Sequence, residues 1–413
     1  MFLGKFFGET EQAAGILSNQ IFTLFLVFQI GISFAITPFI SSAFIKKETE
    51  VKTSILKNAL FLIVGLSCIL FLLLYFSSFV LFYLGQPVEV VNMAIPFYNI
   101  ISLSIIPLGF FFVSKQYIEG HNITKISMVI SVGGNLLNIL LNFCLITGFA
   151  FFPKLGYMGS CWATLIARIV MGVTALTFVF YKSRFAQLRL FLLTKISWQV
   201  VLKVFKNGIA SGAQLLFEVA AFVICGLMCG SFGKSSLDAH GISMGLAAFT
   251  YMFTSGISGA ATIRVANFMT LKNIVGVKKS GYSAFIISAF VMLFFVLIFL
   301  IFHNILPMAF TSSEQVLIIS SNLLLIAALF QMFDGLQVTG LGILRGMEDV
   351  NFPTYLTFIV YWLVTIPLAW LLAFYFNLKV YCVWFALCIS LTLVSVALIF
   401  RFRFLVYKLK KPE

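Results

Sequence analysis

The chain has 413 residues, of which 61% are hydrophobic and only 10% are charged, and its mean hydropathy is +1.09. Charged residues usually make up about a quarter of a water-soluble fold, so this composition excludes a soluble globule, a disordered chain and a coiled coil. The net charge of +14 does not indicate a nucleic-acid partner, because the basic residues are scattered between long apolar runs. The composition indicates an all-α, multi-pass membrane protein.

The apolar runs have the length of transmembrane helices. A helix that crosses the hydrocarbon core of a bilayer needs about 20 apolar residues. Short polar breaks separate eleven such runs in this chain. We therefore predict eleven membrane-spanning helices, at residues 18–43, 57–84, 93–116, 125–150, 158–181, 204–230, 239–263, 281–303, 317–343, 353–376 and 380–402.

Lysine and arginine gather in every second break between these runs. The breaks at residues 182–206 and 264–279 are strongly basic, whereas the breaks that alternate with the basic ones hold only Lys154, Lys234 and Lys379. Basic loops remain on the cytoplasmic side of a membrane. We therefore expect a cytoplasmic C-terminus and, with eleven helices, an N-terminus on the outer side.

The sequence repeats itself about 225 residues apart. Gly8–Phe44 resembles Gly233–Phe268, and Trp162 matches Trp384. The run 204–230 has no counterpart in the first half, so the first half lacks its first helix. A complete version would have six helices in each half, and an even number makes the two repeats parallel.

This repeat predicts two pseudo-symmetric lobes of five and six helices. We expect an N-terminal lobe at residues 1–181 and a C-terminal lobe at residues 204–413. The basic amphipathic stretch 182–203 would connect them on the cytoplasmic side.

Two acidic residues lie in the middle of apolar runs, whereas the other eleven lie in breaks, at span ends or at termini. They are Glu218 and Asp334, with Gln214 one turn before the first and Gln331 and Gln337 three residues to either side of the second. A carboxylate at this depth costs at least about 2–3 kcal/mol, so it normally faces a cavity, has a partner or binds a cation. The acids either join helices by hydrogen bonds or exchange a proton or Na⁺.

Other polar residues within the runs have weaker interpretations. Asn135, Asn138 and Asn142 form an amide stripe on one helical face, which either bridges helices or lines a cavity. His240 is either a titrating group or a hydrogen-bonded structural residue. Arg168, well inside its run, is interpreted as a structural anchor.

The remaining motifs exclude several classes of protein. The seven cysteines lie in or beside apolar runs and indicate neither disulfides nor a zinc site. The chain has no P-loop, GxSxG, HExxH or Rossmann fingerprint, so we expect no catalytic residues and no enzyme. Pro38, Pro107 and Pro367 interrupt helical hydrogen bonding within the runs and are expected to produce kinks.

Several of these segments resemble the multidrug and toxic compound extrusion family, and within it the NorM-type branch. The pairing of FDGLQV with a later LRG is the most specific feature, and the resemblance covers nearly the whole chain. The segments are KNGIASGAQLLFEVAAF (206–222), LDAHGISMGLAAFTYMFTSGISGAATIRVANF (237–268), FDGLQVTGLGILRGMED (333–349), YIEGHNITKISMVISVGGNLLNILLNFCLITG (117–148) and GSCWATLIAR (159–168).

The resemblance implies a fold, a location and an activity. Members of this family have twelve helices in two lobes around a V-shaped cavity, and they export organic cations and other drugs in exchange for Na⁺ or H⁺. Glu218 and Asp334 match the family's coupling-ion residues and would be Na⁺ ligands in a sodium-coupled member; the family's asparagine stripe matches the one already described. The resemblance further implies a monomer in the bacterial inner membrane, in contact with lipid, with no cofactor beyond the coupling ion.

One departure from the family pattern leaves other functions open. The family's first helix, which usually carries an aspartate, has no counterpart in this sequence. The alternatives to multidrug efflux are export of one endogenous metabolite, siderophore or lipid-linked intermediate, and a membrane protein that binds ligands without transporting them.

Overall fold

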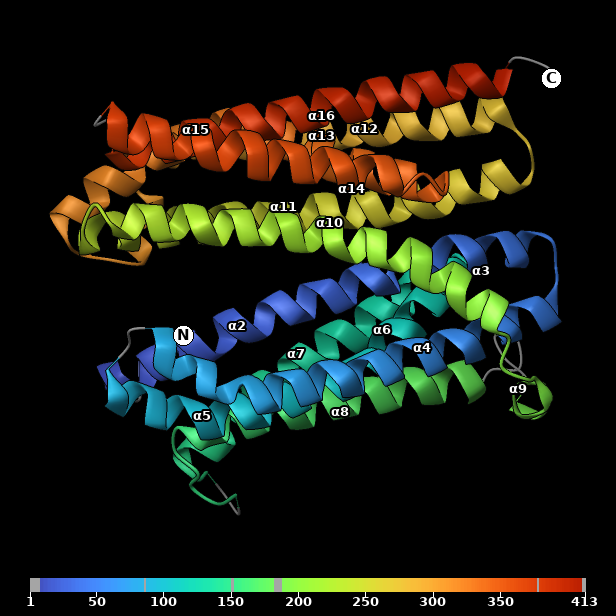
Figure 1. Cartoon of the computed structure of the whole chain (residues 1–413), viewed down its shortest axis with the longest axis horizontal. Coiled ribbons are helices and arrows are strands. Elements are labelled where there is room, and N and C mark those ends of the chain that lie inside the picture. The colour runs from blue at the N-terminus through green and yellow to red at the C-terminus, as the bar shows by residue number, and fades with distance from the viewer. Residues whose placement is uncertain (1–7, 85–86, 150–151, 182–187, 377–378, 411–413) are drawn as a thin grey trace. The chain divides into compact units, whose positions relative to one another are not determined.

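The computed structural model describes residues 8–84, 87–149, 152–181, 188–376 and 379–410. Within these residues the regular elements are helices, with no strand (Figure 1). In chain order they are α2 (Glu9–Ser33), α3 (Ile36–Ile45), α4 (Thr49–Phe76), η1 (Ser77–Leu84), α5 (Val88–Leu103), α6 (Ile105–Gly120), α7 (Thr124–Thr147), α8 (Met158–Tyr181), α9 (Leu188–Leu193), α10 (Trp198–Gly230), α11 (Lys234–Thr270), α12 (Ile274–Phe302), η2 (Leu306–Ala309), α13 (Glu314–Gly346), α14 (Asn351–Phe358), η3 (Ile359–Thr365), α15 (Ile366–Trp370), η4 (Leu371–Tyr375) and α16 (Lys379–Lys410).

Eleven segments of the described chain are long and apolar enough to cross a membrane. Each one coincides with a run predicted from hydropathy, so the eleven expected helices are confirmed. Several extend beyond the apolar run into the polar breaks. The seventh, for example, covers Lys234–Thr270 where the apolar run covers 239–263.

Two of the spans are interrupted near a proline. The first span changes from α2 to α3 around Phe34, and Pro38 has no N–H with which to bond the carbonyl of Phe34. The third span changes from α5 to α6 at Ser104, where Pro107 stands in the same relation to Leu103.

The tenth span contains two π-helical stretches, η3 and η4. They lie on either side of α15, which begins at Ile366 and contains Pro367. The Thr365 hydroxyl donates a hydrogen bond to the carbonyl of Val360, five residues earlier, at 2.9 Å. π-Helical turns are rare and occur frequently at functional sites.

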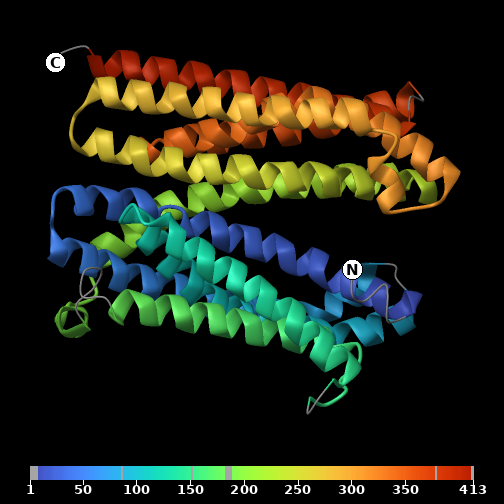
Figure 2. The same ribbon diagram turned by 180° about the vertical axis from the view of Figure 1, so that it is seen from behind.

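The chain divides into two compact units, Met1–Gly212 and Ala213–Glu413, and the boundary falls inside α10. Within each unit the long helices lie side by side with nearly parallel axes (Figures 1 and 2). Of the proposed connector, residues 182–187 lie outside the described residues. Its later part is docked on α4, because Lys57 Nζ donates to the carbonyls of Phe191 and Leu192 at 3.0 and 3.2 Å.

Both units contain the same interhelical hydrogen bonds, about 225 residues apart. In each unit, hydroxyl groups on the first repeated span donate to carbonyls of the helix two spans later. Ser18 bonds the carbonyl of Ala94 at 3.3 Å and Thr37 bonds that of Gln116 at 3.4 Å; Ser243 bonds the carbonyl of Ser320 at 3.3 Å and Thr262 bonds that of Gly342 at 2.8 Å. The repeat predicted from sequence is therefore a repeat of packing as well.

Candidate functional site

Unit 2 buries the two acids that the sequence singles out. Glu218 lies on α10 with 6% of its surface exposed, and Asp334 lies on α13 with 8% exposed. The two carboxyl groups are close enough to interact electrostatically. Two negative charges in a medium of low dielectric constant repel each other strongly, so this pair favours the binding of a cation or a proton.

Gln337 and Tyr361 extend the acid pair into a hydrogen-bonded chain. Gln337 Nε2 donates to Glu218 Oε1 at 2.8 Å, and the Tyr361 hydroxyl donates to Gln337 Oε1 at 3.1 Å. The tyrosine hydroxyl thereby orients the amide, because only an amide oxygen can accept its proton. Gln337 therefore presents a donor to Glu218, and η3, which carries Tyr361, is linked to the acid on α10 through α13.

One further side chain interacts with the acids. Tyr251 on α11 lies within electrostatic range of Glu218 and Asp334, and also of Arg345, which is buried near the end of α13. Four helical segments thus contribute to the site. Sequence reasoning identified Gln337 but missed Tyr251 and Tyr361. A tyrosine in an aromatic-rich apolar run carries no signal that distinguishes a cavity position from a packing one.

The two other predicted glutamines lie buried in the same unit. Gln331 is fully buried, and neither its amide oxygen nor its amide nitrogen has a hydrogen-bond partner among the described residues. Gln214 Nε2 is also buried without one. Burying an amide without hydrogen-bond partners destabilises the fold. The Gln331 oxygen is therefore available as a further ligand for a cation.

His240 makes its described polar contacts away from the acids. Its Nδ1 accepts a hydrogen bond from Trp384 Nε1 at 3.1 Å and lies 3.6 Å from Cys229 Sγ. An indole N–H can only donate, so Nδ1 is the acceptor and Nε2 carries the proton. Among the described residues, no group of three histidine, cysteine or acidic side chains is arranged to hold a metal ion.

The asparagine stripe lies on α7 in unit 1, and its members have different surroundings. Asn138 Nδ2 donates to Thr164 Oγ1 on α8 at 3.3 Å, and Asn142 Nδ2 donates to Asn138 Oδ1 at 3.2 Å. Asn135 is exposed. The stripe therefore bridges two helices at Asn138 and is open at Asn135.

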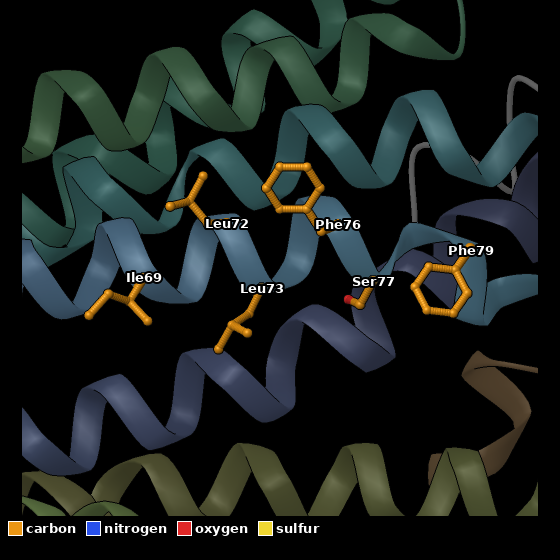
Figure 3. A pocket seen from close by; sticks show the side chains of 6 residues that line it. All are labelled: Ile69, Leu72, Leu73, Phe76, Ser77 and Phe79. Carbon is orange, nitrogen blue, oxygen red and sulfur yellow. The ribbon is translucent and has the colours of Figure 1, made fainter.

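Unit 1 also contains an apolar pocket of about 370 Å³. Its lining comes entirely from α4 and the start of η1 (Figure 3) and contains one polar side chain: Ile69, Leu72, Leu73, Phe76, Ser77 and Phe79. One continuous segment supplies all the lining residues, and no charged group is among them. The pocket therefore suits a hydrocarbon group and has no side chains for catalysis or ion binding.

A membrane protein built from two repeated helical units, with carboxyl groups buried at membrane depth, has the architecture of a transporter. The comparison with family models makes this specific. Residues 1–144 and 210–371 match the MatE family, and the chain belongs to that family. It is a multi-pass membrane transporter and not an enzyme.

Individual relatives are similar to this protein over almost its entire chain. The probable multidrug resistance protein NorM of Mesorhizobium japonicum is 27% identical, over 97% of this chain and 87% of the relative. A transporter of the MOP superfamily from Pyrococcus furiosus has the same fold, with a TM-score of 0.90 at 18% identity over 100% of this chain and 91% of the other. The eukaryotic MATE transporter AtDTX14 superposes with a TM-score of 0.87 at 20% identity, over 98% and 91% of the two chains.

Proposed function

We propose that this chain is a secondary active exporter of amphipathic and cationic organic compounds, which it exchanges for Na⁺ or H⁺ by alternating access. The observation that carries the proposal is the buried pair Glu218 and Asp334, with the Gln337 amide oriented toward Glu218 by Tyr361. Relatives whose names describe multidrug resistance support the substrate class.

The acid pair explains how ion binding and conformation would be linked. A bound cation or proton removes the repulsion between two carboxylates that the low dielectric constant makes strong. A ligand shifts a conformational equilibrium only by its differential affinity for the two states. Ion release therefore favours the state in which the acids are solvated, and ion binding favours the state in which they are buried as observed.

The donor set suits both candidate ions. Two carboxylates and the Gln331 amide oxygen can coordinate Na⁺, which prefers oxygen ligands, and either carboxyl group can hold a proton. As part of the same proposal, the protein resides in a bacterial inner membrane as a monomer, with its C-terminus in the cytoplasm.

The first test measures ethidium efflux from proteoliposomes that contain the full chain, with an imposed Na⁺ gradient and separately an imposed pH gradient. Glu218→Gln and Asp334→Asn remove the negative charges with little change in shape. We expect each to reduce gradient-driven efflux by at least about tenfold, since a lost charge-assisted contact is worth about 1.5–3 kcal/mol.

Matched controls are Glu314→Gln in the first turn of α13 and Asp238→Asn on α11, because both side chains are exposed. These variants should retain wild-type efflux. Unchanged efflux in folded Glu218→Gln and Asp334→Asn proteins would refute the assigned role of the acids. The gradient that supports efflux by the wild-type protein identifies the coupling ion.

A further inference from the structure

A strongly basic segment of unit 1 leads from α8 into α10. Residues 182–206 include six basic residues and no acidic one, and the whole stretch between Glu119 and Glu218 contains no acidic residue. The segment includes α9 and the first turns of α10. α9 lies at one end of the helices of unit 1, beside α4 (Figures 1 and 2).

The start of α10 extends beyond the hydrocarbon core of the membrane. α10 has 33 residues, from Trp198 to Gly230, so it is about 50 Å long. The hydrocarbon core of a bilayer is about 30 Å thick, and the apolar run within α10 begins only at Val204. The first turns of α10 therefore lie at the level of the lipid headgroups, where tryptophan is enriched.

Contacts with α4 hold this segment in a fixed position. The backbone N–H of Ser197 donates to Asn58 Oδ1 at 2.8 Å, and the ring of Trp198 packs edge-on against that of Phe61 with centroids 5.9 Å apart. Lys57 on α4 bonds the last carbonyls of α9, as described above. The segment is therefore an ordered surface and not a free linker.

Two exposed stripes run side by side along the start of α10. One stripe is apolar and the other is polar and basic: Trp198, Leu202 and Phe205 form the first, and Gln199, Lys203 and Lys206 form the second. The end of α9 has the same character, because the exposed Leu192 and Leu193 are followed by the exposed Lys195. Apolar and basic side chains that alternate at headgroup depth suit acyl chains and anionic headgroups respectively.

The lysines of this surface have no carboxylate to neutralise them. Lys203 Nζ lies 4.6 Å from the centre of the Phe39 ring, which positions the ammonium but supplies no negative charge. Among the described residues the ion pair is Arg401 with Asp349, so none of these lysines has an acidic partner there. A phosphate in the adjacent headgroup layer would supply the missing charge.

We propose that Lys195, Lys203 and Lys206, with Trp198 and Leu193 between them, form a binding surface for the headgroups of anionic phospholipids. The apolar stripe favours a lipid over a soluble phosphate compound, because acyl chains cover the stripe while the headgroup contacts the lysines. The proposal does not depend on the export function or on the orientation of the chain, since both leaflets of a bilayer have headgroups.

Brominated lipids test this surface, because bromine atoms on an acyl chain quench tryptophan fluorescence on contact. The full chain is reconstituted in phosphatidylcholine vesicles with the same low mole fraction of brominated phosphatidylglycerol or brominated phosphatidylcholine. Trp198 is 64% exposed, and the difference between the wild-type protein and Trp198→Phe isolates its quenching. We expect at least about fivefold tighter binding of phosphatidylglycerol, since one lysine near an anionic surface contributes about that factor. Equal quenching by the two lipids would overturn the proposal.

Variants then assign the preference to the lysines. The combined Lys195→Gln, Lys203→Gln and Lys206→Gln protein should bind the two lipids within about twofold of each other. The same three positions changed to arginine should retain the preference, because the charge remains. Loss of the preference in the arginine protein as well would overturn a charge-based site. The wild-type comparison decides the proposal even where a glutamine protein fails to fold.

A matched control removes the same charge from another exposed surface. It combines Lys272→Gln, Lys278→Gln and Lys279→Gln, at the turn before α12 and on its first turns. This protein should retain the wild-type preference, and its loss would show an effect of net charge alone. Glycerol 3-phosphate in millimolar excess should leave the quenching unchanged. Release of the brominated phosphatidylglycerol by it would assign the surface to a soluble phosphate compound and overturn the lipid assignment.

Discussion

Gln337 is the residue on which the geometry of the acid pair depends most directly. Its amide donates to Glu218 and accepts from Tyr361, so one side chain connects two helices through α13. We predict that Gln337→Leu lowers ethidium efflux by about tenfold or more while the protein still folds, because it removes a charge-assisted hydrogen bond worth about 1.5–3 kcal/mol and leaves the Tyr361 hydroxyl unpaired.

The measurement is gradient-driven efflux normalised to the amount of monodisperse protein. Gln315→Leu is the matched control, since Gln315 lies on the same helix but is exposed. Wild-type efflux by the Gln337→Leu protein would mean that the hydrogen-bonded chain is incidental to transport.

Sequence reasoning identified the acids but only part of their surroundings. Glu218 and Asp334 are conspicuous because placing a carboxylate in a membrane-spanning run costs free energy whichever way its helical face points. The contribution of Tyr361 depends on the rotation of η3 relative to α13, which is set by packing between helices and not by hydropathy. The same reason explains why Ser104, whose hydroxyl accepts a hydrogen bond from Arg168 Nη1, was not associated with Arg168, although Arg168 itself stood out.

At the scale of helices, close packing between α11 and α13 depends on a small residue. A Cβ atom built on Gly346 would lie 2.6 Å from the carbonyl oxygen of Thr262 and 3.0 Å from Val265 Cβ. The first repeat has the same feature, because a Cβ on Gly120 would lie 2.7 Å from Ile40 Cβ. Glycine therefore permits this helix contact in both units.

We predict that Gly346→Ala destabilises the protein by about 1–3 kcal/mol, since the backbones must separate to admit the methyl group. Thermal unfolding in detergent should show a melting temperature several degrees lower than wild type. Gly245→Ala on α11 is the control, because nothing lies within 4 Å of the added atom, and an alanine there should be neutral or stabilising. Equal melting temperatures for the two variants would contradict the close contact.

Helix positions were the most predictable level of this structure. All eleven runs were found because lipid imposes a long apolar length on each helix. The exchange of α-helix for π-helix at η3 and η4 was not found, since a proline predicts an interruption but not which hydrogen-bond pattern replaces the helix.

The whole molecule combines a repeated framework with unrepeated charges. Gly109 and Gly335 occupy equivalent close contacts, against Ser67 and Ser288 respectively. The residue before Gly335 is Asp334, whereas the residue before Gly109 is Leu108. The repeat therefore conserves the packing positions and differs in charge, with two buried acids in unit 2 and the half-buried Arg168 in unit 1. The two units therefore share a framework but not their buried charges.

The distribution of lysine and arginine predicts how the molecule is inserted in the membrane. The turn at 271–273 and the tail after α16 contain basic residues, whereas the loop 304–313 contains none. Because the side with basic loops stays in the cytoplasm, alkaline phosphatase fused after Ser313 should be active, and fusions after Asn273 or Glu413 should be inactive. Green fluorescent protein at the same three positions should give the opposite result, which controls for expression. Active phosphatase at Glu413 would invert the topology, and with it the side from which Na⁺ or H⁺ reaches Glu218 and Asp334.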